Sequence, residues 1–238
     1  MNSLQGKRIL VSGAGSGIGR AAARLFRDRG ADLVLVGRRL ATLQETLPDG
    51  EFVTLDHTDD AAVAAFARTC APLDGMFLAA GELRPGSVED TPIADFEAVL
   101  AANLRGPWLV AHHLGPKLRD GSSVVLVGSN IGLRAIPDSA AYSVAKAGVH
   151  MLAKVLALEW APRRIRCNAI APGPVRTPMV DARLAASADP TVELARLSVV
   201  NPLGRLGTVT EVAALGAHLL SDDSAWTTGA LITIDGGA

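Results

Sequence analysis

Short apolar runs recur along the whole chain, and they limit its possible folds more than any other feature. The runs are continuous rather than alternating, which is typical of strands buried on both faces of a sheet. We expect strands at 9–11, 33–36, 52–55, 76–80, 124–127, 165–170 and 231–234. Segments with helical spacing lie between them, at 20–29, 61–69, 96–118, 139–160 and 211–220. This alternation predicts an α/β fold with a doubly wound parallel sheet.

Length and charge narrow the class of protein further. The 238 residues contain no repeat or linker, which favours a single domain. A net charge of -1 offers no broad electrostatic field for nucleic acid or an anionic membrane, so we expect a small-molecule partner. The first strand begins almost at once and no apolar run is long enough to span a membrane, so we expect a soluble cytoplasmic protein. Cys70 and Cys167 lack metal-like spacing, and we expect buried, reduced thiols.

A glycine-rich turn, SGAGSGIG at 12–19, separates the first expected strand from the first expected helix. Glycine allows tight turns and close approach to a ligand, and a helix N-terminus offers free N–H groups to a pyrophosphate. The turn therefore predicts a nucleotide cradle. Gly13, Gly15 and Gly17 would equally suit a methyltransferase that binds S-adenosylmethionine. The dinucleotide pattern G-x-G-x-x-G is not met, because Ile18 occupies its last glycine position.

Gly37, Arg38 and Arg39 follow the second expected strand, where an acidic residue would hold the ribose hydroxyls in an NAD-selective site. Two arginines at the start of a helix near Leu40 oppose its macrodipole, so an anionic partner is expected there. A ribose 2′-phosphate is such a partner, and Arg38, supported by Arg39, predicts NADP(H) in preference to NAD(H). The alternative is that both arginines are simply solvated on a surface loop.

Tyr142 and Lys146 are four residues apart in the expected helix at 139–160, so their side chains share one face. A free tyrosine has a pKa of about 10, and one close cation together with a charged cofactor ring would lower that value in a dry site. We therefore expect Tyr142 to act as a general acid. Chance often produces such a pair, but Ser129 ends the preceding strand and Asn103 lies between two helical runs.

Taken together, these motifs resemble the short-chain dehydrogenase/reductase family from Gly13 to Gly237, including its 3-oxoacyl-acyl-carrier-protein-reductase-like members. The turn at 12–19 matches the family's G-x-x-x-G-x-G pattern. The residues that match its catalytic tetrad are Asn103, Ser129, Tyr142 and Lys146. The resemblance implies a Rossmann-like domain in which Tyr142 exchanges the proton, Ser129 polarises the substrate oxygen, and Lys146 with Asn103 relays the proton. Asn103 could instead break a helix without any proton role.

The resemblance also implies a set of cofactor-binding residues. They are Gly13, Ser16, Gly17, Ile18, Gly19, Arg38, Arg39, Asp56, His57, Ala80, Gly81, Tyr142, Lys146, Pro172, Gly173, Val175 and Thr177. Asp56 would contact the adenine, and His57 would use only its backbone. The backbone of Val175 and the hydroxyl of Thr177 would fix the nicotinamide carboxamide. Ala79 departs from the family's usual asparagine, a change that weakens bracing of the sheet more than the chemistry.

Two further segments carry expectations about substrate and assembly. The stretch at 178–203 is irregular and partly apolar, and we expect a substrate lid; the alternative is an amphipathic helix packed permanently on the body. The helix at 139–160 is apolar on more than one face, which indicates a subunit interface. Members of the family commonly assemble through this helix, so the resemblance implies a homo-oligomer, either a tetramer or a dimer.

The sequence therefore predicts an NADP(H)-dependent oxidoreductase acting on a carbonyl/alcohol pair, without a metal. The five histidines show no metal spacing and are expected in the core, at interfaces or on the surface. The substrate stays open among cyclic ketones, steroids, sugars and a 3-oxoacyl thioester, whose acidic carrier could meet Arg163 or Arg176. Two alternative functions belong to other classes of protein. One is a cofactor-sensing binding protein with an idle tetrad, and the other is an S-adenosylmethionine-dependent methyltransferase.

Overall fold

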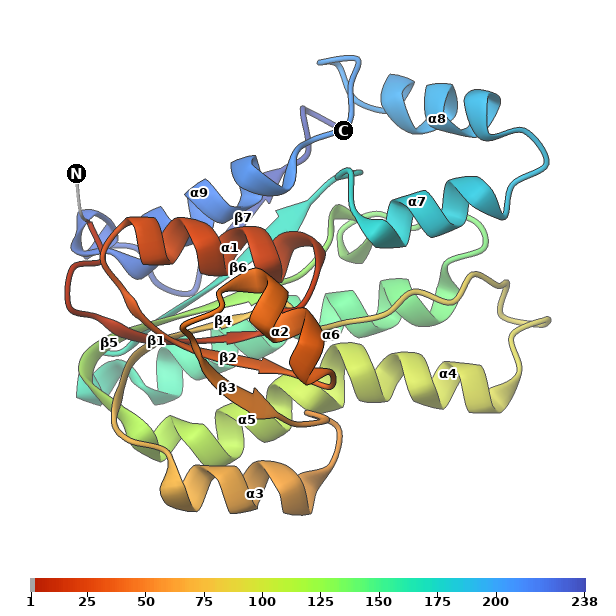
Figure 1. Ribbon diagram of the computed structural model, residues 1–238. Helices are drawn as coiled ribbons and strands as arrows, with labels where there is room; N and C mark the ends of the chain where they lie inside the picture. Colours follow the sequence, from red (N-terminus) through yellow and green to blue (C-terminus); the bar gives the residue numbers. More distant parts are fainter. Residues whose placement is uncertain (1–2) are drawn as a thin grey trace.

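A seven-stranded parallel sheet lies at the centre of the computed structural model, which describes residues 3–238 (Figure 1). The strand order is β3-β2-β1-β4-β5-β6-β7, and every expected apolar run overlaps one strand. The strands are β1 (Arg8–Ser12), β2 (Asp32–Gly37), β3 (Glu51–Thr54), β4 (Leu73–Leu78), β5 (Leu118–Val127), β6 (Arg166–Pro172) and β7 (Leu231–Ile234). The prediction of a doubly wound, Rossmann-like parallel sheet is confirmed.

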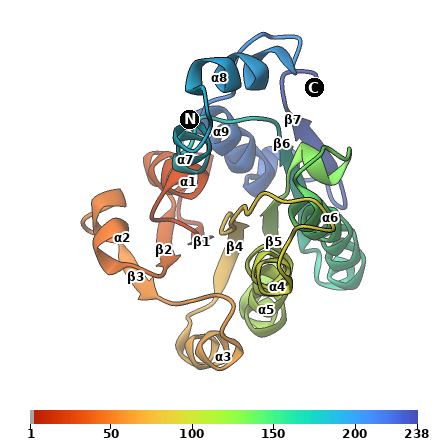
Figure 2. The same cartoon turned by 90° about the vertical axis from the view of Figure 1, so that its right-hand side faces the viewer.

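Helices cover both faces of this sheet (Figure 2). They are α1 (Gly17–Asp28), α2 (Leu40–Thr46), α3 (Asp60–Thr69), α4 (Ile93–Leu100), α5 (Gly106–Leu114), α6 (Ala140–Glu159), α7 (Pro178–Ala185), α8 (Pro190–Val199) and α9 (Val209–Leu220). Ile9 and Val11 of β1 belong to the cluster that contains α1 and α9, whereas Leu10 belongs to the cluster that contains α3, α5 and α6. Successive strand residues point to opposite faces, which explains the continuous apolar runs. Both clusters share one sheet, so the chain forms a single domain.

The register of the strands places the carboxyl ends of the central ones at a common edge. Ser12 pairs with Leu78, Leu78 pairs with Leu126, and Val127 pairs with Ile170. The order of the strands reverses between β1 and β4, which is the place where ligands bind in open α/β sheets. The loops that follow these strands therefore meet at one end of the molecule.

The segment at 96–118 differs from the single helix that its spacing predicts. It consists of the end of α4, a π-helical turn (Ala101–Arg105), α5 and a short 3-10 turn (Gly115–Lys117), and Leu118 already begins β5. Pro107 has no N–H group, so it cannot bond to the carbonyl four residues earlier, which belongs to Asn103. The helix therefore widens at Asn103 instead of continuing as a regular α-helix.

The segment at 178–203 was expected to be irregular, and that prediction is wrong. It forms α7 and α8, which begin with Pro178 and Pro190. Each follows a capping side chain: Thr177 accepts a hydrogen bond from the Val180 N–H at 3.3 Å, and Asp189 accepts one from the Thr191 N–H at 2.9 Å. Proline at the first helical position after such a cap is a helix start signal.

Cys70 and Cys167 are buried and form no disulfide, as expected, and burial raises the pKa of both thiols. Within residues 3–238, no helix combines the length and apolarity needed to cross a bilayer. The same residues contain no group of three or more His, Cys, Asp or Glu side chains that could hold a metal ion.

Candidate active site

The four residues of the expected tetrad meet beyond the carboxyl ends of β4 and β5. The Nζ atom of Lys146 lies 5.5 Å from the centre of the Tyr142 ring, and Tyr142 shares a side-chain hydrogen bond with Ser129. Asn103 lies near Lys146 on the other side of the Gly81 backbone. A Cβ atom at Gly81 would stand 2.5 Å from Asn103 Oδ1 and 3.6 Å from Lys146 Nζ, so these two polar atoms border the same small space.

Ser129 is held by its own turn and by a histidine. Its Oγ accepts a hydrogen bond from the Ile131 N–H at 3.3 Å, and its N–H donates to Nε2 of His150 at 3.4 Å. The imidazole of His150 lies against Gly128 and Gly132, where any Cβ atom would collide with it. Burial, helped by the charges of Lys146 and Lys154, lowers the pKa of His150 to about 4. A neutral imidazole therefore supports the backbone of Ser129.

Burial dominates the electrostatics of Tyr142 and Lys146. It raises the pKa of Tyr142 to about 12 against the opposing effect of the Ser129 hydrogen bond, and it lowers the pKa of Lys146 to about 8. Tyr142 as a residue is half-buried, but its hydroxyl is surrounded by protein. Lys146 by itself does not lower the pKa of Tyr142, because its ammonium group lies near the ring and donates to the Val127 carbonyl at 2.8 Å. Lowering the pKa of Tyr142 requires a positive charge in addition to that of Lys146.

Asn103 occupies the middle of the π-helical turn and is fully buried. Its Nδ2 donates to the carbonyl of Val99 at 2.9 Å and to that of Glu82 at 2.7 Å. Its Oδ1 is also buried and has no hydrogen-bond partner among residues 3–238. The π-helical turn around Asn103 separates α4 from α5, and one polar atom of its amide stays available to another group.

The glycine turn fits the pyrophosphate of a dinucleotide. Gly13 and Gly17 have positive φ angles of 68° and 49°, which side chains other than glycine rarely adopt. A Cβ atom at Gly13 would stand 2.8 Å from the Ala80 N atom, so the turn packs directly on the segment after β4. Ser16 precedes α1 without making a side-chain cap, which leaves the first N–H groups of α1 available to an anion.

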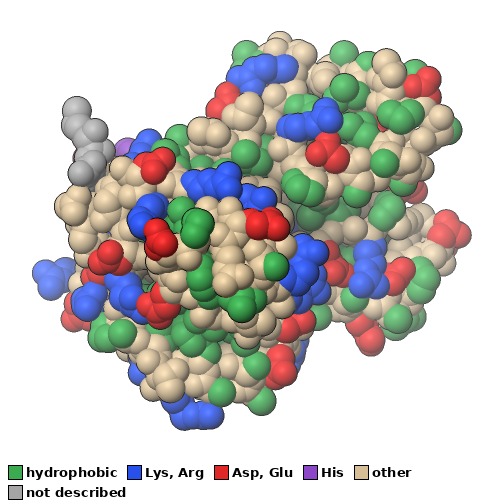
Figure 3. Space-filling model, in the orientation of Figure 1, with side chains coloured by type: hydrophobic (Ala, Val, Ile, Leu, Met, Phe, Trp, Pro, Cys, Tyr) green, Lys and Arg blue, Asp and Glu red, His purple; other side chains and the backbone are tan. Residues whose placement is uncertain are grey.

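Arg38 and Arg39 lie between β2 and α2, and both are exposed. Their guanidinium groups make no hydrogen bond or ion pair with any of the described residues. The space-filling view shows Lys and Arg side chains beside α2, where the surface is hollowed between the body of the sheet and the segments α4, α7 and α8 (Figure 3). Two free cations therefore adjoin the part of the edge where the turn at 12–19 lies.

The segment after β3 lies near these arginines. Asp56 accepts hydrogen bonds from the N–H and the hydroxyl of Thr58, at 2.9 and 2.8 Å. Burial raises the pKa of Asp56, but these bonds and the charges of His57 and Arg38 outweigh burial, so the net shift is downward. The side chain of His57 points to the π-helical turn that carries Asn103. Its Nε2 lies 2.8 Å from the carbonyl oxygen of Ala102.

The loop after β6 approaches the glycine turn. A Cβ atom at Gly17 would lie 3.6 Å from the methyl group of Thr177, so Thr177 adjoins the cradle. Val175 pairs with Gly207 in an isolated bridge, and Gly173 packs closely on Asp235. The structure therefore brings this loop to the same edge as Gly81 and the tetrad.

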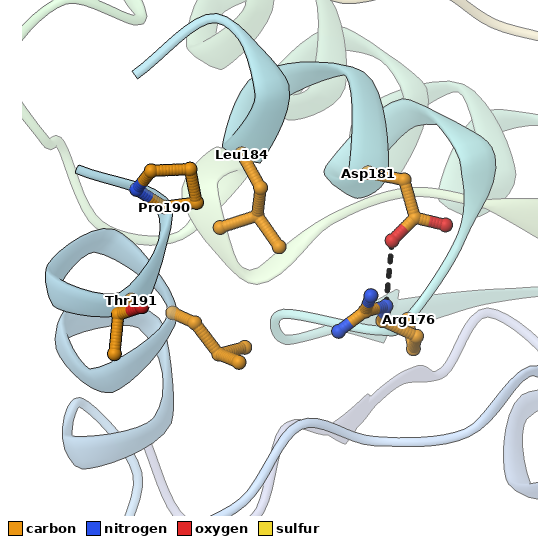
Figure 4. A pocket seen from close by; sticks show the side chains of 6 residues that line it. Arg176, Asp181, Leu184, Pro190 and Thr191 are labelled. Atoms are coloured by element: carbon orange, nitrogen blue, oxygen red, sulfur yellow. Dashed lines mark ion pairs between the residues drawn. The ribbon is translucent and has the colours of Figure 1, made fainter. Parts of the chain in front are cut away.

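A cavity of about 380 Å³ lies between α7 and α8. It is lined by Arg176, Asp181, Leu184, Pro190, Thr191 and Leu194 (Figure 4). Arg176 Nε lies 2.6 Å from Asp181 Oδ1, so its charge is already balanced. Arg163 is bound to Asp120 and to the carbonyl of Leu118, at the start of β5 and therefore at the opposite edge of the sheet. Neither arginine offers an unpaired charge to an acidic carrier.

The sequence did not point to the side-chain roles of His57 and His150. His150 is four residues after Lys146, and Gly128 and Gly132 flank Ser129 closely. These spacings were the available signals. They became meaningful only once α6 was placed against the loop after β5.

Comparisons with known proteins show which family the chain belongs to. A family model described as enoyl-(acyl carrier protein) reductase matches residues 13–238. A 2-keto-3-deoxy-L-fuconate dehydrogenase from Xanthomonas campestris pv. campestris is 32% identical over 98% of this chain and 80% of its own. Levodione reductase from Leifsonia aquatica is 35% identical over 96% of this chain and 92% of its own.

A solved structure shows the same fold. It is that of a short-chain dehydrogenase family protein from Francisella tularensis subsp. tularensis, with a TM-score of 0.90 and 28% identity, covering 97% of this chain and 98% of that one. The sheet order and these matches agree. The chain therefore belongs to the short-chain dehydrogenase/reductase family, whose oxidoreductases use nicotinamide cofactors and act on small molecules.

Proposed function

We propose that this protein is an NADP(H)-dependent oxidoreductase that interconverts a small-molecule ketone or aldehyde and the matching alcohol, with Tyr142 as general acid and base. The observation that carries the proposal is the meeting of Ser129, Tyr142, Lys146 and Asn103 around one space at the carboxyl edge of the sheet. Relatives named for levodione and for 2-keto-3-deoxy-L-fuconate support a carbonyl or alcohol substrate.

Each side chain has a role that follows from its position. Ser129 and Tyr142, joined by a hydrogen bond, would hold the substrate oxygen between their hydroxyl groups. When bound, a nicotinamide cofactor supplies or accepts the hydride. In reduction, Tyr142 gives its proton to the oxygen of the carbonyl group while hydride reaches the carbon, so that C=O becomes CH–OH. In oxidation, the Tyr142 phenolate accepts the hydroxyl proton.

Lys146 and Asn103 would return the proton to Tyr142. The Nζ atom of Lys146 and the unpartnered Oδ1 of Asn103 border the same space beside Gly81. Because the pKa of Lys146 is lowered by burial to about 8, its ammonium group can release and regain a proton near neutral pH. The cofactor would lie along the turn at 12–19, Gly81 and the loop that carries Thr177.

Replacing Tyr142 with phenylalanine should abolish turnover. Purified protein would be assayed for NADPH and NADH oxidation with levodione, 2-keto-3-deoxy-L-fuconate, 3-oxoacyl thioesters and keto sugars. Loss of the proton donor should lower kcat by about a hundredfold or more, while NADPH affinity, measured by fluorescence titration, should change less than about twofold, because no contact to the cofactor's phosphates is lost.

Near-normal rates in Tyr142→Phe would refute this mechanism. Tight NADPH binding by the wild-type protein without turnover of any compound would favour a cofactor-sensing protein instead. The titration also serves as the folding control, since a misfolded variant would lose NADPH binding.

The free cations after β2 support the preference for NADP(H). Changing Arg38 to aspartate should lower kcat/KM for NADPH by about tenfold or more, because an acidic group would repel the 2′-phosphate. The kcat/KM for NADH should stay unchanged or rise. Arg68→Asp makes the same charge change on the exposed last turn of α3 and should alter neither value. Equal losses with both cofactors in Arg38→Asp would contradict a role in 2′-phosphate binding.

We also propose that α7 and α8 form the substrate lid. They lie side by side beyond the carboxyl edge of the sheet (Figures 1 and 2), and α7 begins directly after Thr177, which adjoins the glycine turn. Exposed apolar side chains on both helices, such as Met179 and Val192, would be covered on closure.

Substrate together with NADPH should slow amide hydrogen exchange in 178–199, because a closed lid shields backbone that is open in the free protein. The measurement is exchange detected by mass spectrometry, with the buried helix α9 as the internal control. Identical exchange in 178–199 with and without ligands would support helices packed permanently on the body.

The outer face of α5 and α6 supports a homo-oligomer, which we propose is a dimer or a tetramer. Trp108, Val144, Met151 and Leu158 are each more than half exposed on these two helices. A groove of about 390 Å³ lies between the two helices, and Trp108, Leu152 and Trp160 are among the residues that line it. Exposed apolar side chains that gather on one face are typical of interaction surfaces.

Light scattering should give the mass of a dimer or tetramer for the wild-type protein and a smaller mass for Met151→Glu, because a buried carboxylate would destabilise the interface. Val88→Glu is the matched control, since Val88 is 83% exposed and lies outside both helices. A monomeric wild-type protein would contradict the proposal.

A further inference from the structure

The π-helical turn that carries Asn103 lacks one backbone donor. The N–H of Gly106 bonds to the carbonyl of Ala101, five residues earlier, so it does not serve the carbonyl of Ala102. The next donor in such a turn would be residue 107, but this is Pro107, which has no N–H group. The carbonyl oxygen of Ala102 therefore depends on a partner from outside the helix.

His57 supplies that partner from the loop after β3. Its Nε2 lies 2.8 Å from the Ala102 oxygen, and because a carbonyl can only accept, Nε2 carries the proton. Burial lowers the pKa of His57, so the imidazole is neutral at physiological pH, with the proton on this nitrogen. The ring lies directly against Gly106, where a Cβ atom would overlap it. Gly106 thus leaves room for the His57 ring, and Pro107 leaves the Ala102 carbonyl without a backbone donor.

A second bond joins the same two segments. The guanidinium of Arg105 donates to the carbonyl of Thr58, and Thr58 in turn donates to the Asp56 carboxylate from both its N–H and its hydroxyl. The segment at 56–58 is therefore tied to the turn at 101–105 by side chains from both sides. Asn103 lies inside that turn, next to Ala102.

We infer that His57 is a positioning residue, whose N–H group replaces the missing backbone donor to Ala102 and holds the widened turn so that Asn103 faces Lys146. The inference rests on the proposed function for its effect on catalysis. His57 also links two parts of the site. One is the segment that contains Asp56, near Arg38 and Arg39, and the other is the space beside Asn103 and Lys146, where the proton would be returned to Tyr142. Contacts to a cofactor at Asp56 would then steady Asn103.

The test compares two replacements of His57. Glutamine can place an N–H donor near the position of Nε2, whereas leucine fills the space without a donor. His113→Leu is the matched control, because His113 on α5 also makes a 2.7 Å bond to the start of α3, at Asp60, but lies away from the π-helical turn. The readouts are kcat at saturating NADPH, KM for NADPH, and amide hydrogen exchange in 101–108 without any ligand.

We expect His57→Leu to lower kcat by about tenfold and to speed exchange in 101–108 by a similar factor, because a buried carbonyl loses the donor that His57 supplies. His57→Gln should restore both values to within about twofold, and His113→Leu should change neither. A general loss of stability would speed exchange throughout the protein, so α9 reports whether the effect is confined to the turn.

Two results would overturn the inference. One is a His57→Leu protein that shows a higher KM for NADPH with unchanged kcat and unchanged exchange in 101–108, since His57 would then serve cofactor binding alone. The other is a glutamine variant as impaired as the leucine variant, since the N–H donor would then be irrelevant. If the wild-type protein turns over no substrate, the proposed function fails, while the exchange data still decide whether His57 holds the turn.

Discussion

Burial of both faces of the parallel sheet is the constraint on which the rest of the structure depends. In β1, Ile9 and Val11 are buried under α1 and α9, and Leu10 is buried under the helices of the other face. Each fully buried aliphatic side chain of this kind contributes roughly 1.5–3 kcal/mol. Because all seven strands run in the same direction, the central loops that follow them gather at one edge. The position of the site is a consequence of how the core is buried.

Close backbone contact decides how that edge can be used. The turn at Gly13 approaches Ala80 so closely that a Cβ atom would not fit. A Cβ atom at Gly81 would occupy the space between Asn103 Oδ1 and Lys146 Nζ. Glycine is required at these points because two segments meet, and at Gly13 also because φ is positive. The cradle and the proton path therefore share the segment after β4.

Desolvation sets the electrostatics of the tetrad more strongly than the pairing of its charges does. Burial disfavours both the Tyr142 phenolate and the Lys146 ammonium, so the pKa values of the two groups, about 12 and about 8, move in opposite directions. In such surroundings any added positive charge acts with little screening. A site of this kind is poised to change its protonation when a charged group binds.

The sequence by itself determined the strands, the glycine turn, most of the helices and the pairing of Tyr142 with Lys146, because these depend on residues close together in the chain. Apolar runs, G-x-x-x-G-x-G and a four-residue helical spacing are local signals. Only the tertiary structure decided which group serves the carbonyl that Pro107 leaves without a donor, the bonds made by His57 and His150, and the weak influence of Lys146 on the Tyr142 hydroxyl. Each of these depends on burial or on a contact between segments distant in the sequence, and no local pattern specifies which group donates to that carbonyl or how deeply a phenol is buried.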